Sequence, residues 1–317
     1  MTTFLTPQQR AGRTCAAVEA AVAAGCELGL TVTEPTVLHD VFSVVVHLAP
    51  SPVVARIPTV LPRPDDLAAI ARRQQDELDV TQWLADQKIP VIAPSPLAPR
   101  EPVQRDGFSM TFWPFVEEAR DKEPDYVANA ESVAGLHAAL RAYPGRRLEF
   151  LSAADPRFIA DSLALLDQHP DLIGAAELDR ARREWQFLEP FACSRSAFEA
   201  RFPGVDLQPI HGDSPPANIF NGVDGDLYAD FELVTLGPVE WDLAALGPEH
   251  EAAYNRGARR NGTRPLDEEV LAFVNALGML RVIATLTLVP QLPELMDYLK
   301  PAVDHWQMTP FAAGTSS

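Results

Sequence analysis

Carboxylate and amide side chains that could carry out chemistry gather between residues 211 and 232. Asp213 and Asn218 lie in the segment His211–Asn218, and Asp230 follows shortly afterwards. A carboxylate beside a hydroxyl group can orient it and accept its proton, and carboxylate and amide oxygens are ligands that Mg²⁺ accepts. These residue types therefore suit an alcohol that attacks a phosphoryl group. The alternative is a polar turn in which Asn218 and Asp230 are ordinary turn residues.

The spacing of these residues resembles that in the aminoglycoside phosphotransferase family, also called the phosphotransferase enzyme family. Protein kinases carry H-R-D-x-x-x-x-N and then D-F-G, and this chain has the same interval from Asp213 to Asn218, followed by Asp230–Glu232. Gly212 in place of the kinase Arg, the prolines after Asp213 and the later segment Trp241–Ala244 are features shared with the family. Taken singly, each of these features would be weak, but together they are fairly specific.

The resemblance implies a role for each residue of the motif. Asp213 would be the catalytic residue that activates the acceptor hydroxyl, and Asn218 and Asp230 would hold Mg²⁺. His211 and Asp242 would support the catalytic loop, with Asp242 acting from the start of the next helix. An N-terminal cap of that helix is an equally physical interpretation of Asp242, and the two roles are compatible. ATP or GTP would be the co-substrate that donates the phosphoryl group.

Residues close to the motif are expected to line the acceptor pocket, namely Glu232, Glu240 and Trp241. A cleft lined by carboxylates concentrates cations, so the expected acceptor is a small hydroxyl compound with positive charge, such as an aminoglycoside or another antibiotic. Exposed surface is the competing interpretation of Glu240. Apolar residues could instead form the wall of a pocket for a neutral ring: Trp241, Leu292, Tyr298 and Trp306.

The first third of the chain is expected to hold the nucleotide phosphates. The segment Val53–Pro58 looks like the third strand of the family, on which a cation contacts the α and β phosphates, and Arg56 would be that cation. Glu77 on the following helix would be its partner. Arg keeps the permanent charge of Lys but has a forked geometry. Arg56 could also be an ordinary residue at the end of a strand.

The stretch Ser109–Phe115 resembles the hinge between the two lobes of the family. Backbone groups there, around Met110 and Phe112, would meet the purine ring of the nucleotide. An ordinary edge strand has the same alternating pattern and is the competing interpretation.

The turn between the first two expected strands departs from the family. Residues Leu38–Ser43 contain no glycine, whereas the family has a glycine-containing turn whose N–H groups approach the triphosphate. Ser43 would donate a hydrogen bond to phosphate in this chain. Asp40 would repel phosphate unless its side chain is turned away.

The elements that must position these residues follow a simple order along the chain. Short Val-rich or alternating runs predict strands at residues 31–39, 42–49, 53–57 and 108–113, with smaller ones near 210, 219 and 227–229. Longer runs predict helices at residues 7–28, 67–86, 128–142, 156–168, 175–188 and 268–288. The stretch Arg256–Arg264 is interpreted as a basic, solvated loop.

The strands come first along the chain and most of the helices follow. This order predicts an α+β fold with a sheet-rich N-terminal lobe and a larger helical C-terminal lobe. The resemblance adds that this would be the two-lobed, protein-kinase-like fold. Residues 1–114 would form the nucleotide-binding lobe with its small antiparallel sheet, and residues 115–317 the catalytic and acceptor-binding lobe.

Composition excludes several classes of protein. The chain has 317 residues and a formal net charge of -18, so nucleic acid is not an expected partner. Its three cysteines form no CxxC pair, and no P-loop or dinucleotide motif occurs. We expect no membrane span and a cytoplasmic location; no sequence feature specifies an oligomeric state.

Two other functions are compatible with the sequence. The glycine-free turn would suit a catalytically weak or inactive kinase-like protein that binds small molecules. An unrelated helical enzyme with an accidental His-Gly-Asp match is the third possibility. Nucleotide-dependent thermal stabilisation separates these alternatives, because a ligand of the folded state raises the melting temperature.

Overall fold

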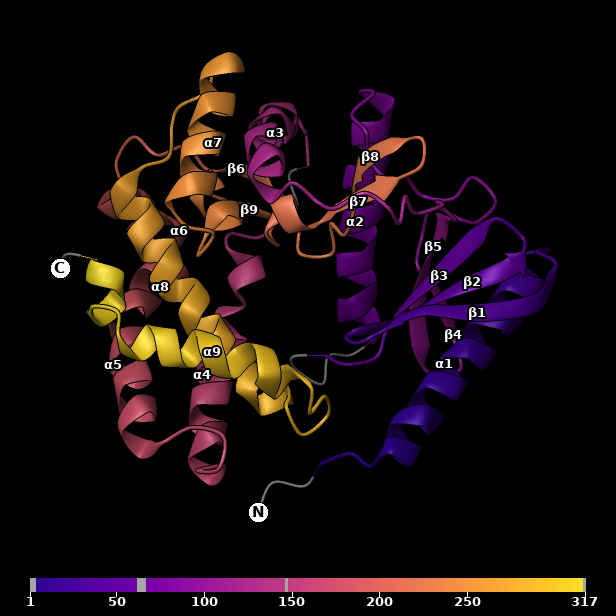
Figure 1. The fold of residues 1–317 in the computed structure, drawn as a ribbon, viewed down its shortest axis with the longest axis horizontal. Coiled ribbons are helices and arrows are strands. Elements are labelled where there is room, and N and C mark those ends of the chain that lie inside the picture. The colour runs from indigo at the N-terminus through magenta and orange to yellow at the C-terminus, as the bar shows by residue number, and fades with distance from the viewer. Residues whose placement is uncertain (1–3, 62–66, 146–147, 316–317) are drawn as a thin grey trace. The chain divides into compact units, whose positions relative to one another are not determined.

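The structure is a computed structural model that describes residues 4–61, 67–145 and 148–315. Contacts divide the chain into two compact units (Figure 1). Unit 2 consists of residues 4–123 and 220–232, and unit 1 contains residues 124–219 and 233–317. Unit 2 thus extends past residue 114 and also takes in a segment from the second half of the sequence.

Unit 2 is built on a five-stranded antiparallel sheet with the strand order β1-β2-β3-β5-β4. Its strands are β1 (Val32–Asp40), β2 (Ser43–Pro50), β3 (Val53–Pro58), β4 (Val103–Arg105) and β5 (Phe108–Pro114). The sequence predicted all of these except β4, which is only three residues long.

Helix α1 (Pro7–Glu27) covers one face of this sheet (Figure 1). Its first turn is fixed by a capping box, in which Thr6 and Gln9 bond each other's backbone N–H. Four alanines with near-helical spacing pack on the apolar side chains of β2, β3 and β5: Ala17, Ala20, Ala21 and Ala24. Their small side chains allow close approach of the helix to the sheet.

Helix α2 (Leu67–Asp86) agrees with the helix predicted from Leu67 to about Asp86 and contacts β5. Buried Gln74 exchanges hydrogen bonds with Ser109 of β5, at 2.5 Å to its carboxamide oxygen and 3.2 Å from its nitrogen. This pair anchors the helix one turn before Glu77, which lies three residues further on the same face.

The hairpin of β7 (Ile219–Gly222) and β8 (Gly225–Tyr228) is bonded to unit 2 on both sides. On one side, Tyr228 exchanges backbone hydrogen bonds with residues 90 and 92, at 2.8 and 2.9 Å. On the other, Asn221 and Val223 bond residues 119 and 117, at 2.8 and 3.0 Å. The segment that ends with Asp230 is therefore part of unit 2.

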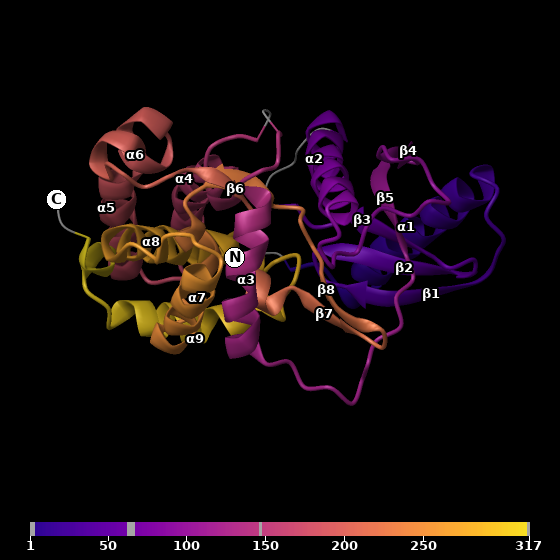
Figure 2. The ribbon, with the colours of Figure 1, turned by 90° about the horizontal axis from the view of Figure 1, so that it is seen from above.

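Unit 1 is mainly helical (Figure 2). Its helices are α3 (Tyr126–Leu140), α4 (Pro156–Leu165), α5 (Ala175–Ala192), α6 (Arg195–Arg201), α7 (Pro248–Arg260), α8 (Glu268–Thr285) and α9 (Leu295–Gln307). The short strands β6 (Gln208–Ile210) and β9 (Thr235–Gly237) pair antiparallel. The α+β fold class, with a small antiparallel sheet and a helical majority, is confirmed.

The segment Glu268–Leu288, which contains α8, has the length and hydropathy of a membrane span, with a mean hydropathy of 1.8. The expectation that no segment meets these criteria was wrong. However, 56% of this segment is buried inside the structure. Its buried residues include Phe273, Leu277 and Leu280, so α8 is a core helix of unit 1.

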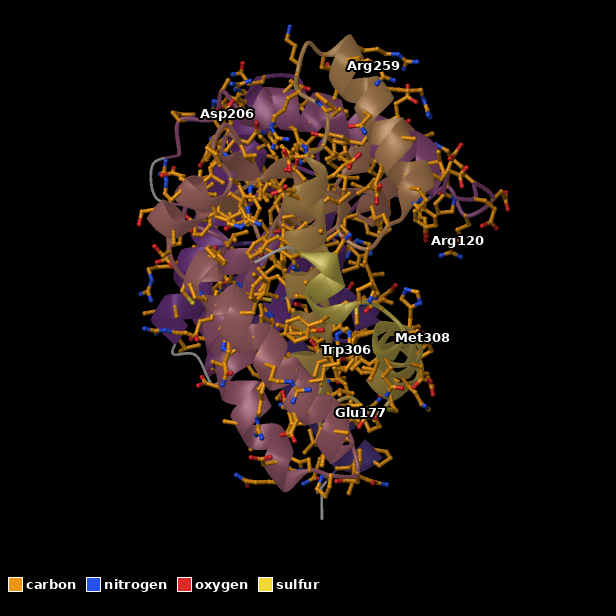
Figure 3. The ribbon with its side chains drawn as sticks, turned by 90° about the vertical axis from the view of Figure 1, so that its left-hand side faces the viewer. Arg120, Glu177, Asp206, Arg259, Trp306 and Met308 are labelled. Atoms are coloured by element: carbon orange, nitrogen blue, oxygen red, sulfur yellow. The ribbon has the colours of Figure 1, made fainter. Side chains whose placement is uncertain are left out.

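The prediction of a solvated loop at Arg256–Arg264 was wrong for residues 256–260, whereas residues 261–264 are not helical. Residues 256–260 form the last turns of α7, where Arg259 is exposed (Figure 3). Gly257 is buried, and a Cβ atom there would lie 2.1 Å from the carbonyl oxygen of Glu131 in α3. The absence of a side chain at Gly257 therefore allows α7 to pack closely against α3, and the two helices lie side by side (Figure 2).

Candidate active site

The loop that carries Asp213 follows β6 in unit 1 and begins with two buried residues. Gly212 has a φ of +91°, and a Cβ atom there would lie 1.9 Å from the carbonyl oxygen of Leu233. No other residue fits, because both the backbone conformation and the space exclude a side chain. This explains why glycine stands where protein kinases have an Arg.

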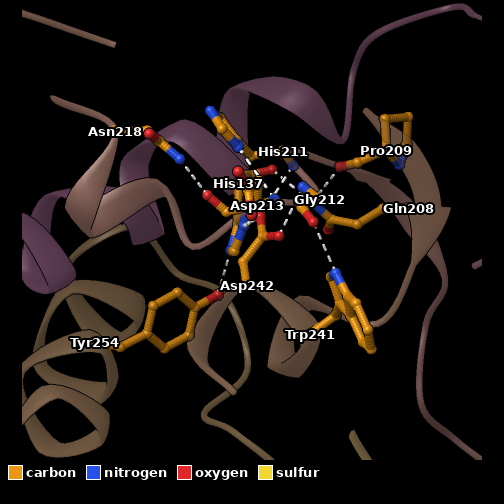
Figure 4. A network of polar contacts seen from close by, with 10 residues as sticks. All are labelled: His137, Gln208, Pro209, His211, Gly212, Asp213, Asn218, Trp241, Asp242 and Tyr254. Carbon is orange, nitrogen blue, oxygen red and sulfur yellow. Dashed lines mark hydrogen bonds and ion pairs between the residues drawn. The ribbon is translucent and has the colours of Figure 1, made fainter. Parts of the chain in front are cut away.

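A single buried carboxylate holds the start of this loop (Figure 4). Asp242, on the short 3-10 helix η4 (Val239–Leu243), accepts hydrogen bonds from the backbone N–H of His211 at 2.9 Å and of Gly212 at 2.8 Å. Trp241 donates its indole N–H to the carbonyl of Gly212 at 2.9 Å. The loop is thus fixed immediately before Asp213.

Two residues that the sequence did not reveal extend this network (Figure 4). His137 of α3 lies 2.8 Å from Asp242 through Nε2 and 2.9 Å from the hydroxyl of Tyr254 through Nδ1. A carboxylate can only accept, so Nε2 donates. Burial, with Glu240 nearby, raises the pKa of Tyr254 and keeps its hydroxyl neutral. An apolar helix containing one His was the only sequence signal.

Asp213 is half-buried, and neighbouring residues hold its backbone. Its N–H donates to Nδ1 of His211 at 3.3 Å, and the carboxamide of Asn218 donates to its carbonyl. Asn129 of α3 donates to the carbonyl of Pro216 at 2.9 Å. The catalytic candidate and the amide candidate for metal binding therefore lie on one braced loop of unit 1.

The predicted cation lies in unit 2 among three carboxylates. Nη1 of Arg56 is 2.8 Å from Glu77, and Nη2 is 2.7 Å from Asp230 and also pairs with Glu232. Burial opposes the charge of Arg56, but these carboxylates outweigh it and raise the pKa. The structure thus brings together the predicted strand cation, its helix partner and the carboxylate candidate for metal binding.

Glu77 is almost fully buried, with 2% of its surface exposed. Burial raises the pKa of this carboxyl to about 8, although Arg56 acts in the opposite direction. Asp230 has a left-handed backbone with a φ of 63°, a conformation that Asp tolerates better than most residues. Both features set these carboxyl groups apart from ordinary surface residues.

The register of the sheet fixes the direction of the Met110 and Phe112 side chains. Arg56 pairs with Thr111 across β3 and β5, so Thr111 shares its face of the sheet. Met110 and Phe112 point to the opposite face, where they pack in the core against α1 and are 0% and 2% exposed. The carbonyl of Phe112 also accepts a hydrogen bond from Ser95. Neither side chain is available to a purine on the Arg56 face.

The glycine-free turn has its acidic residue turned away from the Arg56 face. Asp40 accepts hydrogen bonds from Thr14 at 2.5 Å and from Arg13 at 3.3 Å, both on α1. Ser43 pairs with Pro58 next to the Val45–Arg56 pair and lies on the Arg56 face, with 7% of its surface exposed. The repulsion expected between Asp40 and a phosphate on that face is therefore removed.

Two residues expected in the acceptor pocket are part of the interior of unit 1. Glu240 is 0% exposed and accepts hydrogen bonds from both terminal nitrogens of Arg264, at 2.5 and 2.9 Å, and from the N–H of Asp267 at 2.7 Å. Trp241 is 5% exposed and bonded to Gly212. The acceptor-lining prediction for these two residues was wrong, because their polar atoms are occupied internally.

The apolar residues considered as an alternative pocket wall are also partly buried in the interior. Leu292 and Trp306 are 1% and 2% exposed, and the indole of Trp306 donates to buried Glu184 at 2.8 Å. Tyr298 is 77% exposed. Of these three side chains, Tyr298 alone has the surface exposure needed to contact a ligand.

Solved structures with the same fold are numerous, but their sequences are distant. The GDP and kanamycin complex of APH(2")-IIIa has a TM-score of 0.60 and 14% identity, over 90% of this chain and 97% of that one. Choline kinase LicA from Streptococcus pneumoniae has a TM-score of 0.58 and 16% identity, over 90% and 99%. APH(3'')-Id from Streptomyces rimosus has a TM-score of 0.54 and 20% identity, over 84% and 98%.

The kinase-like fold expected from the sequence is confirmed by these similarities. No curated protein matches the chain. The family model described as "Phosphotransferase enzyme family" matches residues 44–304, which include the Arg56 cluster and the Asp213 loop. The chain therefore belongs to the phosphotransferase enzyme family.

Proposed function

We propose that the protein is a kinase that transfers the γ-phosphoryl group of ATP or GTP to a hydroxyl group of a small molecule. The observation that carries this proposal is the bracing of Asp213. Buried Asp242 accepts hydrogen bonds from the N–H groups of His211 and Gly212, the two residues before Asp213. An ordinary polar turn does not require such bonds. Catalysis by proton transfer does require a carboxylate held in a fixed place.

In the proposed reaction, Asp213 orients the acceptor hydroxyl and accepts its proton as the oxygen attacks the γ-phosphorus. The bond between the γ-phosphorus and the bridging oxygen breaks, and the nucleoside diphosphate leaves with the electron pair. Arg56 binds the α and β phosphates through its guanidinium. Glu77 orients that guanidinium through the contact at 2.8 Å.

The carboxylate cluster of unit 2 fits a divalent cation. Glu77, Asp230 and Glu232 surround the single positive charge of Arg56. Asp230 Oδ1 is a buried oxygen that lies 2.7 Å from Nη2 of Arg56. Mg²⁺ takes one or two protein carboxylates together with phosphate oxygens. Asp230 and Asn218 would hold the ion, which when bound neutralises charge on the phosphates.

The proposed magnesium site would be completed by phosphate oxygens of the nucleotide. Within residues 4–61, 67–145 and 148–315, no group of three or more His, Cys, Asp or Glu side chains is arranged to hold a metal. A magnesium site completed by the nucleotide needs no such group.

The purine is expected just beyond β5, since Met110 and Phe112 face α1. Phe115 donates its N–H to the carbonyl of Pro52 at 3.0 Å. The backbone N–H and C=O of Val116 have no hydrogen bond to any part of the chain that the structure describes. Val116 therefore offers one donor and one acceptor to the edge of a purine.

We propose an amine-bearing alcohol as the acceptor. The net charge of -18 favours cations near the protein. Kanamycin and streptomycin, which carry basic nitrogen groups, are bound in two of the similar structures, and another similar structure is a choline kinase. Glu232 pairs with Arg56 but is 35% exposed and remains the acidic candidate, whereas Glu240 is fully buried and bound to Arg264.

The test is a melting experiment followed by a phosphorylation screen. Mg-ATP and Mg-GTP should each be compared with Mg²⁺ alone, and at least one nucleotide should raise the melting temperature. Purified protein is then incubated with that nucleotide and with aminoglycosides, amino alcohols, macrolides and neutral sugars. A nucleotide that binds without phosphorylation of any acceptor, in a screen that includes a positive-control kinase, would favour a binding protein over a kinase.

A further inference from the structure

A β-bulge changes which residues of β1 face Arg56. Val37 pairs with Val46, whose side chain packs on the α1 face of the sheet. Without a bulge, residue 39 would share the face of residue 37, because side chains alternate along a strand. The register shifts between Val37 and His39, so His39 instead pairs with Val45. Bulges commonly re-aim side chains next to functional sites.

The contacts of the next residue support this assignment independently. Asp40 bonds Thr14 and Arg13 of α1, so its side chain is on the α1 face. His39, the adjacent residue in the same strand, must point to the opposite face. His39 pairs with Val45, and Val45 pairs with Arg56. The three residues form one row across the sheet.

His39 is exposed, and neither ring nitrogen has a hydrogen bond or an ion pair with any residue that the structure describes. Adjacent strands lie about 4.8 Å apart, so the backbones of His39 and Arg56 are about 10 Å apart. Both side chains extend from the same face. A nucleotide phosphate chain that contacts Arg56 therefore comes within reach of the imidazole.

We infer that His39 is a phosphate-binding residue of the nucleotide site, which supplies an N–H donor in place of the backbone donors of a glycine-containing turn. This inference rests on the proposed function, because the ligand is the same nucleotide. It identifies His39 as the residue that contacts the end of the phosphate chain away from the purine. Ser43, the earlier candidate in this turn, has only 7% of its surface exposed.

The test measures nucleotide affinity by calorimetry in three variants. His39→Phe keeps a ring of similar size without donors, and His39→Gln keeps an N–H donor. Val37→Ala is the matched control, since Val37 lies on the same strand, is 41% exposed and belongs to the α1 face. The ligands are Mg-ATP, Mg-GTP, the two corresponding diphosphates and the two nucleosides.

His39→Phe should weaken binding of the triphosphates by about 10- to 100-fold, as expected for a lost hydrogen bond to a charged group. The diphosphates should lose less affinity and the nucleosides none. His39→Gln should retain part of the affinity, and Val37→Ala all of it.

Unchanged triphosphate affinity in His39→Phe would overturn the inference, and so would an equal loss for nucleosides and triphosphates. If the wild-type protein binds none of the nucleotides, the proposed function fails together with the inference. If the wild-type protein binds nucleotide and His39→Phe binds it equally well, only the inference fails.

Discussion

Two carboxylates of the same motif have opposite environments and serve different purposes. Asp242 is fully buried, and its oxygens accept bonds from His211, Gly212 and His137. Asp213 is half-buried and lies directly after the amides that Asp242 holds. The first residue therefore fixes geometry, and the second is available for chemistry.

Asp213→Asn should reduce phosphoryl transfer by about 100- to 10,000-fold, because an amide cannot accept the acceptor proton. Nucleotide affinity should change little, since the proposed partner of Asp213 is the acceptor hydroxyl. Turnover on an acceptor and calorimetric nucleotide affinity are the two measurements. Asp206→Asn is the control, because Asp206 is exposed in the same unit. Equal turnover of Asp213→Asn and wild type would remove Asp213 from catalysis.

Glu77 should make the folded state less stable as the pH rises. Its folded-state pKa of about 8 lies above the ordinary value of 4.5, so folding favours the protonated form. Its contribution to stability is complete below about pH 4.5 and is lost as the pH rises through about 8. Between about pH 6 and about pH 9, the wild-type melting temperature should fall more than that of Glu77→Gln. Exposed Glu34→Gln serves as the control and should follow wild type; parallel curves for Glu77→Gln and wild type would contradict the assignment.

The residue types at the site could be predicted from the sequence, but the directions of several side chains could not. The spacing of Asp213 and Asn218 indicated chemistry through its match to the kinase pattern, and the role of Arg56 came from the family resemblance. The alternation in β5 predicted a strand, yet only the packing of α1 decides that Met110 and Phe112 face away from Arg56. His39 was missed for a related reason. The bulge between Val37 and His39 turns the His39 side chain to the opposite face of the sheet.

At the scale of the elements, periodicity was informative where a helix has one continuous apolar face. Helix α2 was predicted from Leu67 to about Asp86, in agreement with the described helix. Helix α7 was not among the predicted helices, and its last residues were interpreted as a loop because of Gly257 and several arginines. Glycine breaks an isolated helix pattern, but here it permits contact with α3, and such a contact between distant segments leaves no local signal.

Gly257→Ala should destabilise the protein by about 1–3 kcal/mol, because the added methyl group meets the backbone of α3 and overpacks the interface. Gly278 provides a matched control in α8, where the nearest atom to an added Cβ lies 3.9 Å away. Gly278→Ala should be neutral or should stabilise by up to about 1 kcal/mol, since alanine favours the helix. Denaturant unfolding of both variants measures the difference. Equal changes in the free energy of unfolding for the two substitutions would show that the contact with α3 does not require glycine at position 257.

At the scale of the whole molecule, the net charge of -18 should affect the capture of a cationic acceptor. The Debye length falls from about 30 Å at 0.01 M salt to about 3 Å at 1 M. The ratio kcat/KM for an amine-bearing alcohol should therefore fall by about tenfold or more over this range. For a neutral alcohol of similar size, the ratio should change much less. Equal salt dependence for both acceptors would exclude charge steering as a source of specificity.

The discontinuity of unit 2 has a consequence for synthesis of the chain on the ribosome. The residues that complete this unit, 220–232, follow its first segment only after an intervening stretch of about 100 residues. At about 5–20 residues per second, they emerge about 5–20 s later. During that interval, Arg56 can pair with Glu77 but lacks Asp230 and Glu232. A fragment ending at Glu123 reproduces this nascent state, and a synthetic peptide with the sequence of residues 220–232 should bind to it and raise its melting temperature.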